Sequence, residues 1–421
     1  MSVLTTSRVR ASLGGMAQIT SSAVMDFVAN NLAKRYPMSR QLTEDQQQFV
    51  QSIRTFTQKE CGTHEQRREL TDNGALNHNQ KLYEKAASLG WIGVSLPQEY
   101  GGSGGTVVDE CLMLQEMARG GAPIAGVIPT LIVAGSYNRF GSQEQQKDRL
   151  AGIADGETHS IAMSEPESGS DVASLTCRAE RDGDGWVING QKSWISNSQF
   201  TTSTLLVART AQGERKHDGL TMFEVPAQSP GLEVRAIDTM GLREINDIFF
   251  NDCRLPGTAV IGEVDRGWQQ LVSGLERERL MIASQLLGIG QRSFDRLVGF
   301  VRERQQFGKP ISNYQVVRHR IADMATELQC AEAFLYDMAH EVSTNEGVRV
   351  LASETSMAKL KCTEVARHVA LEGMQLMGAA GFAAEYEMEQ DVKVALSSTI
   401  YGGTSEIQRE VISKRLLGAI A

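Results

Sequence analysis

The sequence lacks the features that mark three specialised classes of protein. Its six cysteines are widely spaced and include no CxxC pair, so neither a disulfide framework nor a metal site is expected. No stretch is long and apolar enough to span a bilayer. The formal net charge is −9 and no basic block is present, which excludes a nucleic-acid partner. What remains is a globular protein with an ordinary apolar content of 41% and free thiols in a reducing compartment.

The first 40 residues differ in composition from the rest of the chain. Residues 1–24 are rich in Ser and Thr, carry two arginines and contain no acidic residue, as mitochondrial transit peptides do. Composition alone is weak support for targeting, so a bacterial amino-terminal arm, or a true start at Met16 or Met25, is the favoured interpretation. We therefore expect an N-terminal extension over 1–40 and a cytoplasmic bacterial protein, with the mitochondrial matrix as the alternative.

Residues 41–157 have the apolar spacing of helices. Thr43 and Gln46 form a capping-box signature ahead of the first helix. Further helices are expected over about 79–89 and 106–119, separated by a glycine-rich loop over 97–105. We predict an N-terminal helical domain.

Residues 158–262 change to short β-branched and aromatic runs separated by turn signals. The runs over 204–209, 220–225 and 247–252 are typical of strands. Asp182-Gly183 and Asn189-Gly190 are typical of hairpin turns. We predict a middle antiparallel β-domain.

Residues 263–421 return to helical spacing. Long amphipathic segments cover 265–303, 313–342, 346–377 and 404–417, and Gly308-Lys309-Pro310 breaks the first from the second. Helices of this length pack as an antiparallel four-helix bundle. The whole chain is therefore expected to be an α+β protein whose β-domain lies between two helical domains.

Five motifs occur along this framework: AMSEPESGSDVASL (162–175), QKSWISN (191–197), RERQQFGK (302–309), GMQLMGAAGF (373–382) and YGGTSEIQRE (401–410). Together, in this order and at these separations, they resemble the acyl-CoA dehydrogenase flavoprotein family over nearly all of residues 41–421. The resemblance implies an FAD-dependent oxidoreductase that removes hydrogen across Cα and Cβ of an acyl-CoA thioester. It also implies a homotetramer that passes electrons to electron-transfer flavoprotein.

The resemblance assigns the first two motifs to the flavin and the adjacent thioester channel. Four residues of the first motif would line both: Met163, Ser164, Gly169 and Ser170, the last also facing substrate. In the second motif, Trp194 and Ile195 would lie against the isoalloxazine ring, and the Ser196 hydroxyl would hydrogen-bond flavin N5. Without the resemblance, Gly169-Ser170-Asp171 would be an ordinary turn and Trp194 would simply fill the sheet core.

The three C-terminal motifs are assigned to a cofactor site shared between subunits. By resemblance, Arg304 and Phe307 would reach the FAD pyrophosphate of the neighbouring subunit, where the arginine fork suits phosphate. Gln375 and Gly378 would approach the adenosine half from the same neighbour. Two residues at the end of the bundle would lie near the flavin: Thr404 and Glu406.

The catalytic base departs from the commonest family pattern. The residue before the GTSEIQ segment is a glutamate in many members, but here it is Gly402, whose N–H can polarise the thioester carbonyl but which has no carboxylate. Members that resemble isovaleryl-CoA and long-chain acyl-CoA dehydrogenases supply the glutamate at the position of Glu278, with Arg279 beside it in a supporting role. We therefore predict that Glu278 removes the α-proton, with a pKa raised by partial burial.

Other interpretations remain open from the sequence. By itself, the run Glu276-Arg277-Glu278-Arg279 would be a charged face of a solvated helix. On the same fold, a flavin-dependent monooxygenase or a non-oxidative thioester enzyme would need no carboxylate at position 278. The identity of the acyl group cannot be deduced from the sequence.

Overall fold

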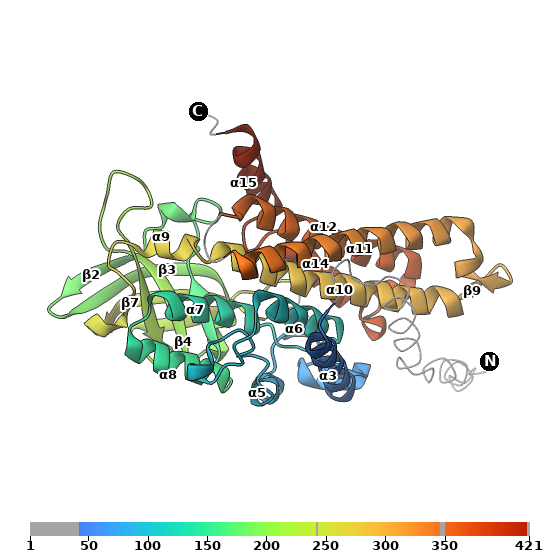
Figure 1. The fold of residues 1–421 in the computed structure, drawn as a ribbon, viewed down its shortest axis with the longest axis horizontal. Coiled ribbons are helices and arrows are strands. Elements are labelled where there is room, and N and C mark those ends of the chain that lie inside the picture. Colours follow the sequence, from blue (N-terminus) through green and yellow to red (C-terminus); the bar gives the residue numbers. More distant parts are fainter. Residues whose placement is uncertain (1–41, 241–242, 346–349, 419–421) are drawn as a thin grey trace, which may run out of the picture.

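The computed structural model describes residues 42–240, 243–345 and 350–418, so the expected extension over 1–40 lies outside the described residues. Along the chain a β-sheet unit lies between two helical units, which confirms the predicted α+β fold and its order, while in space the two helical units also pack against each other (Figure 1). Among the described residues, no helix has both the length and the apolar character needed to cross a membrane.

The N-terminal unit is helical, as predicted. The predicted capping box is present, because Thr43 and Gln46 exchange two side-chain-to-backbone hydrogen bonds of 3.2 Å. The predicted loop contains the short 3₁₀ helix η1 (Gln98–Tyr100). The α-helices of this unit are α3 (Glu44–Cys61), α4 (His64–Leu70), α5 (Gln80–Ser88), α6 (Val107–Arg119), α7 (Val127–Phe140) and α8 (Gln143–Ala154).

The middle unit is one twisted sheet, with strand order β6-β7-β3-β2-β4-β5-β8 and β1 added against β4. Most pairs are antiparallel, but β1 and β2 both pair with β4 in parallel, so the sheet is mixed where the sequence predicted antiparallel pairing only. The strands are β1 (His159–Ala162), β2 (Arg178–Asp182), β3 (Gly185–Ser196), β4 (Ser203–Arg209), β5 (Leu220–Pro226), β6 (Leu232–Ala236), β7 (Ile245–Leu255) and β8 (Val260–Ile261).

One of the two predicted hairpin turns is wrong. The turn at Asp182-Gly183 does join β2 to β3. Asn189-Gly190 instead lies inside β3, at a bulge in its pairing with β7. The Asn189 side chain exchanges hydrogen bonds with Asp252 across that bulge, and Gly190 allows the strand to pass close to Cys177. A bulge uses the same residue types as a turn, because both need backbone freedom.

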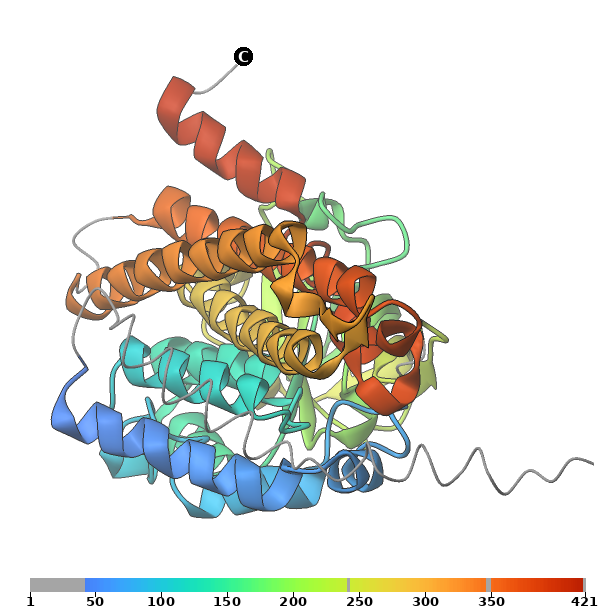
Figure 2. The same ribbon diagram turned by 90° about the vertical axis from the view of Figure 1, so that its right-hand side faces the viewer.

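The C-terminal unit is a bundle in which α10 packs against α11, α12 and α14, while α15 projects from the end of α12 (Figures 1 and 2). Two predicted boundaries were wrong: the first helix is broken at Ser273-Gly274, and the segment before Thr404 contains an additional helix, α14. The helices are α9 (Gly267–Val272), α10 (Leu275–Glu303), α11 (Gln315–Thr344), α12 (Ala352–Met377), α13 (Ala379–Phe382), α14 (Met388–Ser398) and α15 (Ser405–Leu417), with the short hairpin β9 (Gln305–Gln306) and β10 (Lys309–Pro310) between α10 and α11.

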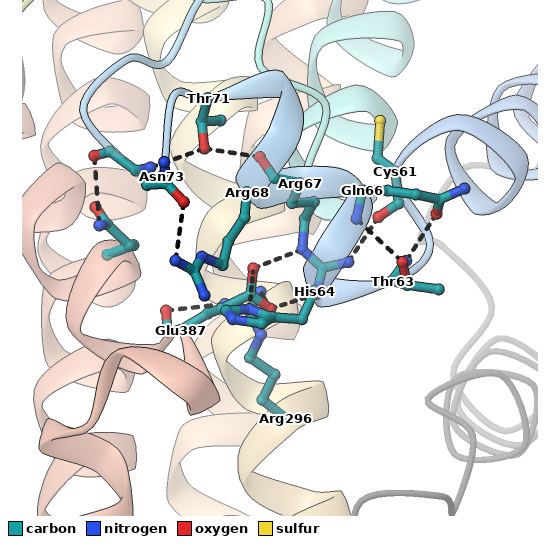
Figure 3. A network of polar contacts seen from close by, with 12 residues as sticks. Cys61, Thr63, His64, Gln66, Arg67, Arg68, Thr71, Asn73, Arg296 and Glu387 are labelled. Atoms are coloured by element: carbon teal, nitrogen blue, oxygen red, sulfur yellow. Dashed lines mark hydrogen bonds and ion pairs between the residues drawn. The ribbon is translucent and has the colours of Figure 1, made fainter.

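A cluster of ion pairs joins the two helical units (Figure 3). Arg67 of α4 donates to Glu387 Oε1 at 2.6 Å, and Arg296 of α10 donates to Glu387 Oε2 at 3.0 Å. Burial would raise the pKa of Glu387, but these two arginines outweigh it and lower the pKa to about 2. The cluster therefore ties the helix that carries Glu278 to the N-terminal unit.

Candidate active site

The first two motifs lie side by side because a buried ion pair joins them. Lys192 of β3 has no exposed surface, and its ammonium donates to Glu165 Oε1 at 2.8 Å and to the Met163 carbonyl at 2.9 Å. The Ser193 N–H also donates to the Ser164 carbonyl at 2.9 Å. Sequence reasoning assigned no role to Lys192 or Glu165. A lysine at an inward position of the strand alternation was the available signal.

Glu165 also closes the loop that carries the glycine-serine turn. Its carboxylate accepts from the backbone N–H groups of Thr176 at 2.7 Å and Cys177 at 2.8 Å. Burial opposes ionisation, but Lys192 and these donors outweigh it and hold the pKa of Glu165 below its ordinary value. Gly169 and Ser170 lie exposed on the loop, and an added Cβ at Gly169 would meet nothing within 4 Å. The loop surface is therefore free to receive a ligand.

Trp194 does not fill the sheet core. It lies at a second bulge in β3, with φ +66°, and its side chain is 60% exposed while Ile195 is buried. Ser196 is half-buried next to Asn197, whose Oδ1 is buried without a hydrogen-bond partner among the described residues. The strained backbone turns a flat aromatic surface outward, which is the arrangement needed to contact a planar ring such as a flavin.

Glu278 and Gly402 meet although 124 positions separate them in the sequence. Glu278 lies in the first turn of α10, and Gly402 lies in the turn between α14 and α15 with φ +61°. A Cβ built on Gly402 would lie 3.7 Å from Glu278 Oε1 and well inside van der Waals contact with Ile282 Cδ1. The α10 carboxylate therefore reaches the space that a side chain at position 402 would enter.

The charged run around Glu278 is not a uniformly solvated helix face. Arg277 pairs with buried Glu110, and Glu276 accepts from the Leu351 N–H at 2.7 Å. Arg279 is buried and donates to the Ala352 carbonyl at 3.4 Å. The four charged side chains of this run therefore contact four different neighbours, and Glu278 is the one of the four that lies beside the Gly402 turn.

Burial raises the pKa of Glu278 above its ordinary value, and the nearby Arg279 and Lys359 charges only partly oppose this. Lys359 of α12 is a second residue that sequence reasoning missed. It is fully buried, and it donates to the Ser398 carbonyl at 3.0 Å and to the Gly403 carbonyl at 2.9 Å. Its signal was a single lysine on the apolar face of a predicted helix. The site is therefore a partly desolvated carboxylate beside a turn held by an ammonium group.

The remaining predicted residues fall into two groups. Thr404 caps α15 by accepting from the Ile407 N–H at 3.2 Å, and Glu406 is exposed in the first turn of that helix, so both lie at the Gly402 turn. The other group lies at the opposite end of the bundle, about 39 Å from Glu278 along α10, at 1.5 Å rise per residue. It comprises Arg304, Phe307, Gln375 and Gly378, all exposed.

A mixed sheet flanked along the chain by two helical units, with an exposed tryptophan on one strand and a partly desolvated carboxylate on α10, is the arrangement that the comparisons place among the flavin-dependent oxidoreductases. Family models described as the acyl-CoA dehydrogenase N-terminal, middle and C-terminal domains match residues 43–157, 160–253 and 265–417. The chain belongs to the acyl-CoA dehydrogenase family, an oxidoreductase family whose members are FAD flavoproteins and are typically tetramers.

Three similar proteins cover most of the chain. A probable acyl-CoA dehydrogenase of Bacillus subtilis is 31% identical, over 90% of this chain and 100% of its own length. The mitochondrial isovaleryl-CoA dehydrogenase of Solanum tuberosum is 32% identical, over 89% and 90%. A solved glutaryl-CoA dehydrogenase of Mycobacterium smegmatis in complex with FADH2 is 27% identical, with a TM-score of 0.82 over 90% and 96%.

Proposed function

We propose that the chain is an FAD-dependent acyl-CoA dehydrogenase that converts an acyl-CoA to the 2-enoyl-CoA, with Glu278 as the base. The Glu278 carboxylate takes the α-proton, and the β-hydrogen leaves with its electron pair as a hydride, so that a Cα=Cβ double bond forms. Bound FAD supplies the hydride acceptor at flavin N5. The observation that carries the proposal is the 3.7 Å separation between Glu278 Oε1 and the Cβ position of Gly402.

The surroundings of Glu278 suit a base that works near neutral pH. Its pKa is raised by burial, so the carboxylate holds a proton more strongly than an exposed glutamate does. The Gly402 N–H would polarise the thioester carbonyl, which stabilises the negative charge that develops when the α-proton leaves. Proton removal and charge stabilisation would then act on adjacent atoms of the substrate.

The residues present fit an FAD. Trp194 offers an exposed ring beside Ser196, and the exposed Gly169-Ser170 loop offers backbone and hydroxyl donors. Arg304 would hold the pyrophosphate, but it lies about 39 Å along α10 from the Glu278 of its own chain. We therefore propose that each cofactor is bound by two subunits, in a homo-oligomer that is expected to be a tetramer.

Anaerobic bleaching of bound flavin by a panel of acyl-CoA thioesters tests the proposal. The wild type should bleach with at least one straight or branched acyl-CoA. Glu278→Gln should keep its flavin but lose bleaching, because the amide cannot accept the α-proton. Glu276→Gln is the matched control, since its amide oxygen can still accept from the Leu351 N–H.

Two results would contradict the assignment. Unchanged bleaching in Glu278→Gln would remove this residue from the mechanism. Failure of the wild type to bleach with any thioester, with flavin bound, would favour a monooxygenase or a non-oxidative thioester enzyme. Electron-transfer flavoprotein is the proposed acceptor, and rapid reoxidation of the bleached protein by it would support that partner. The bacterial relative supports a cytoplasmic location.

A further inference from the structure

We infer that Lys359 is a positioning residue of this site: its buried ammonium fixes the turn that carries Gly402 beside the Glu278 carboxylate. The inference rests on the proposed function for its catalytic meaning. Its structural basis is independent of substrate and cofactor, because it concerns contacts within the chain.

The two acceptors of Lys359 lie at the two ends of one turn. Ser398 is the last residue of α14, and Gly403 lies two residues before α15 begins. Lys359 Nζ donates to the carbonyl oxygens of both, at 3.0 Å and 2.9 Å, and thereby links α12 to both ends of the turn. A cation at the carbonyl end of α14 also complements the partial negative charge of that helix terminus. The hydrogen bonds from Lys359 therefore restrain the residues between these two ends, Gly402 included.

A second side chain holds the same turn without carrying charge. Gln408 donates to the carbonyl oxygens of Gly402 at 3.1 Å and Gly403 at 3.0 Å. With these carbonyls engaged by Gln408 and Lys359, the two peptides that directly follow the Gly402 N–H are held in place, which restricts the turn from which an oxyanion donor would act. Gln408 and Lys359 both restrain the turn, but of these two residues only Lys359 is charged, so only Lys359 also affects the pKa of Glu278.

The charged groups that act on Lys359 come from two packed helices. Glu278 and Arg279 approach from α10, and Glu406 approaches from α15. Burial lowers the pKa of Lys359 to about 8, and the two carboxylates oppose the decrease, so Lys359 is charged at neutral pH. Its charge in turn opposes the burial that raises the pKa of Glu278. Removing that charge should leave Glu278 protonated over a wider pH range.

Two substitutions separate the two roles. Lys359→Met removes the charge and both hydrogen bonds, whereas Lys359→Gln removes the charge but keeps an N–H donor. Lys361→Met is the matched control, because Lys361 lies on the same helix and pairs with Glu327 on its exposed side. Lys359→Gln also keeps the test usable if the methionine variant folds poorly.

The charge role is measured on the resting holoenzyme, without substrate. The infrared carbonyl band of protonated Glu278 is followed against pH, with each spectrum referenced to the same protein carrying Glu278→Gln. The band should persist to higher pH in both Lys359 variants than in the wild type and in Lys361→Met. An unchanged titration in the Lys359 variants would overturn the charge role.

The positioning role is measured by hydrogen exchange of the peptide spanning residues 398–405. Exchange should be about tenfold faster or more in Lys359→Met, with the α10 amides unchanged, and closer to wild type in Lys359→Gln. Flavin reduction at saturating acyl-CoA should fall by about 100-fold in Lys359→Met, as expected for a displaced catalytic group. Wild-type protection in both variants would overturn the positioning role. If the wild type bleaches with no thioester, the proposed function fails while the infrared and exchange results still decide the role of Lys359.

Discussion

Gly402→Ala should destabilise the protein, and Ile282→Val should relieve much of that effect. A residue other than glycine at φ +61° costs about 1–2 kcal/mol. The new methyl group would also overlap Ile282 Cδ1, and such overpacking costs about 1–3 kcal/mol. The free energy of unfolding should therefore fall by roughly 2–5 kcal/mol. Valine lacks Cδ1, so in the Ile282→Val background only the backbone part, about 1–2 kcal/mol, should remain.

Urea unfolding of the four proteins of the double-mutant cycle measures this coupling. Ile282→Val alone should cost about 0.5–1.5 kcal/mol. Gly183→Ala is the matched control, because Gly183 has φ +57° and an added Cβ there would meet nothing within 4 Å. It should show the backbone cost without the overlap. Additivity of the Gly402 and Ile282 changes to within about 0.5 kcal/mol would refute the steric reasoning.

Three further predictions concern other parts of the molecule. Lys192→Met leaves the buried Glu165 carboxylate without its cation, so the free energy of unfolding should fall by about 3–5 kcal/mol in urea titrations. Glu387 has a pKa of about 2 against an ordinary 4.5, so its contribution, about 3 kcal/mol, is complete above pH 4.5 and is lost as the pH falls toward 2. Stability measured across that window should lose this slope in Glu387→Gln, and an unchanged slope would exclude Glu387 as its source. Trp194→Ala should change stability by under about 0.5 kcal/mol, because the side chain is exposed, yet lower the FAD content of the purified protein; an unchanged FAD content would contradict the proposed ring contact.

The sequence predicted the parts of the fold that depend on local signals. The capping box at Thr43, the hairpin at Asp182-Gly183 and the long bundle helices are set by neighbouring residues, and all are present. Asn189-Gly190 was misassigned because its backbone freedom serves a bulge that only the partner strand reveals. The parallel pairing of β1 with β4 is likewise a long-range property that no local run encodes.

The candidate site was predicted to a similar degree. The structure brings Glu278 Oε1 to 3.7 Å from the Cβ position of Gly402, while the catalytic roles that the family resemblance assigns to these two residues stay predictions. The position of Lys192 in the strand alternation and of Lys359 on an apolar helix face indicated burial, but their partners, a distant carboxylate and backbone carbonyls, could not be identified from the sequence. The acceptors of such a buried lysine are known only once the surrounding helices and strands are packed.

The length of α10 predicts that two different inactive variants can complement each other. One end of this helix carries Glu278 and the other carries Arg304, so under the proposed pairing each copy of the chain donates to two different catalytic centres. In a pair of subunits of which one lacks Glu278 and the other lacks Arg304, one catalytic centre lacks both residues and the other centre has both. Two alleles that are each inactive should then restore activity when co-expressed, whereas either allele paired with the wild type should leave one centre of the pair intact.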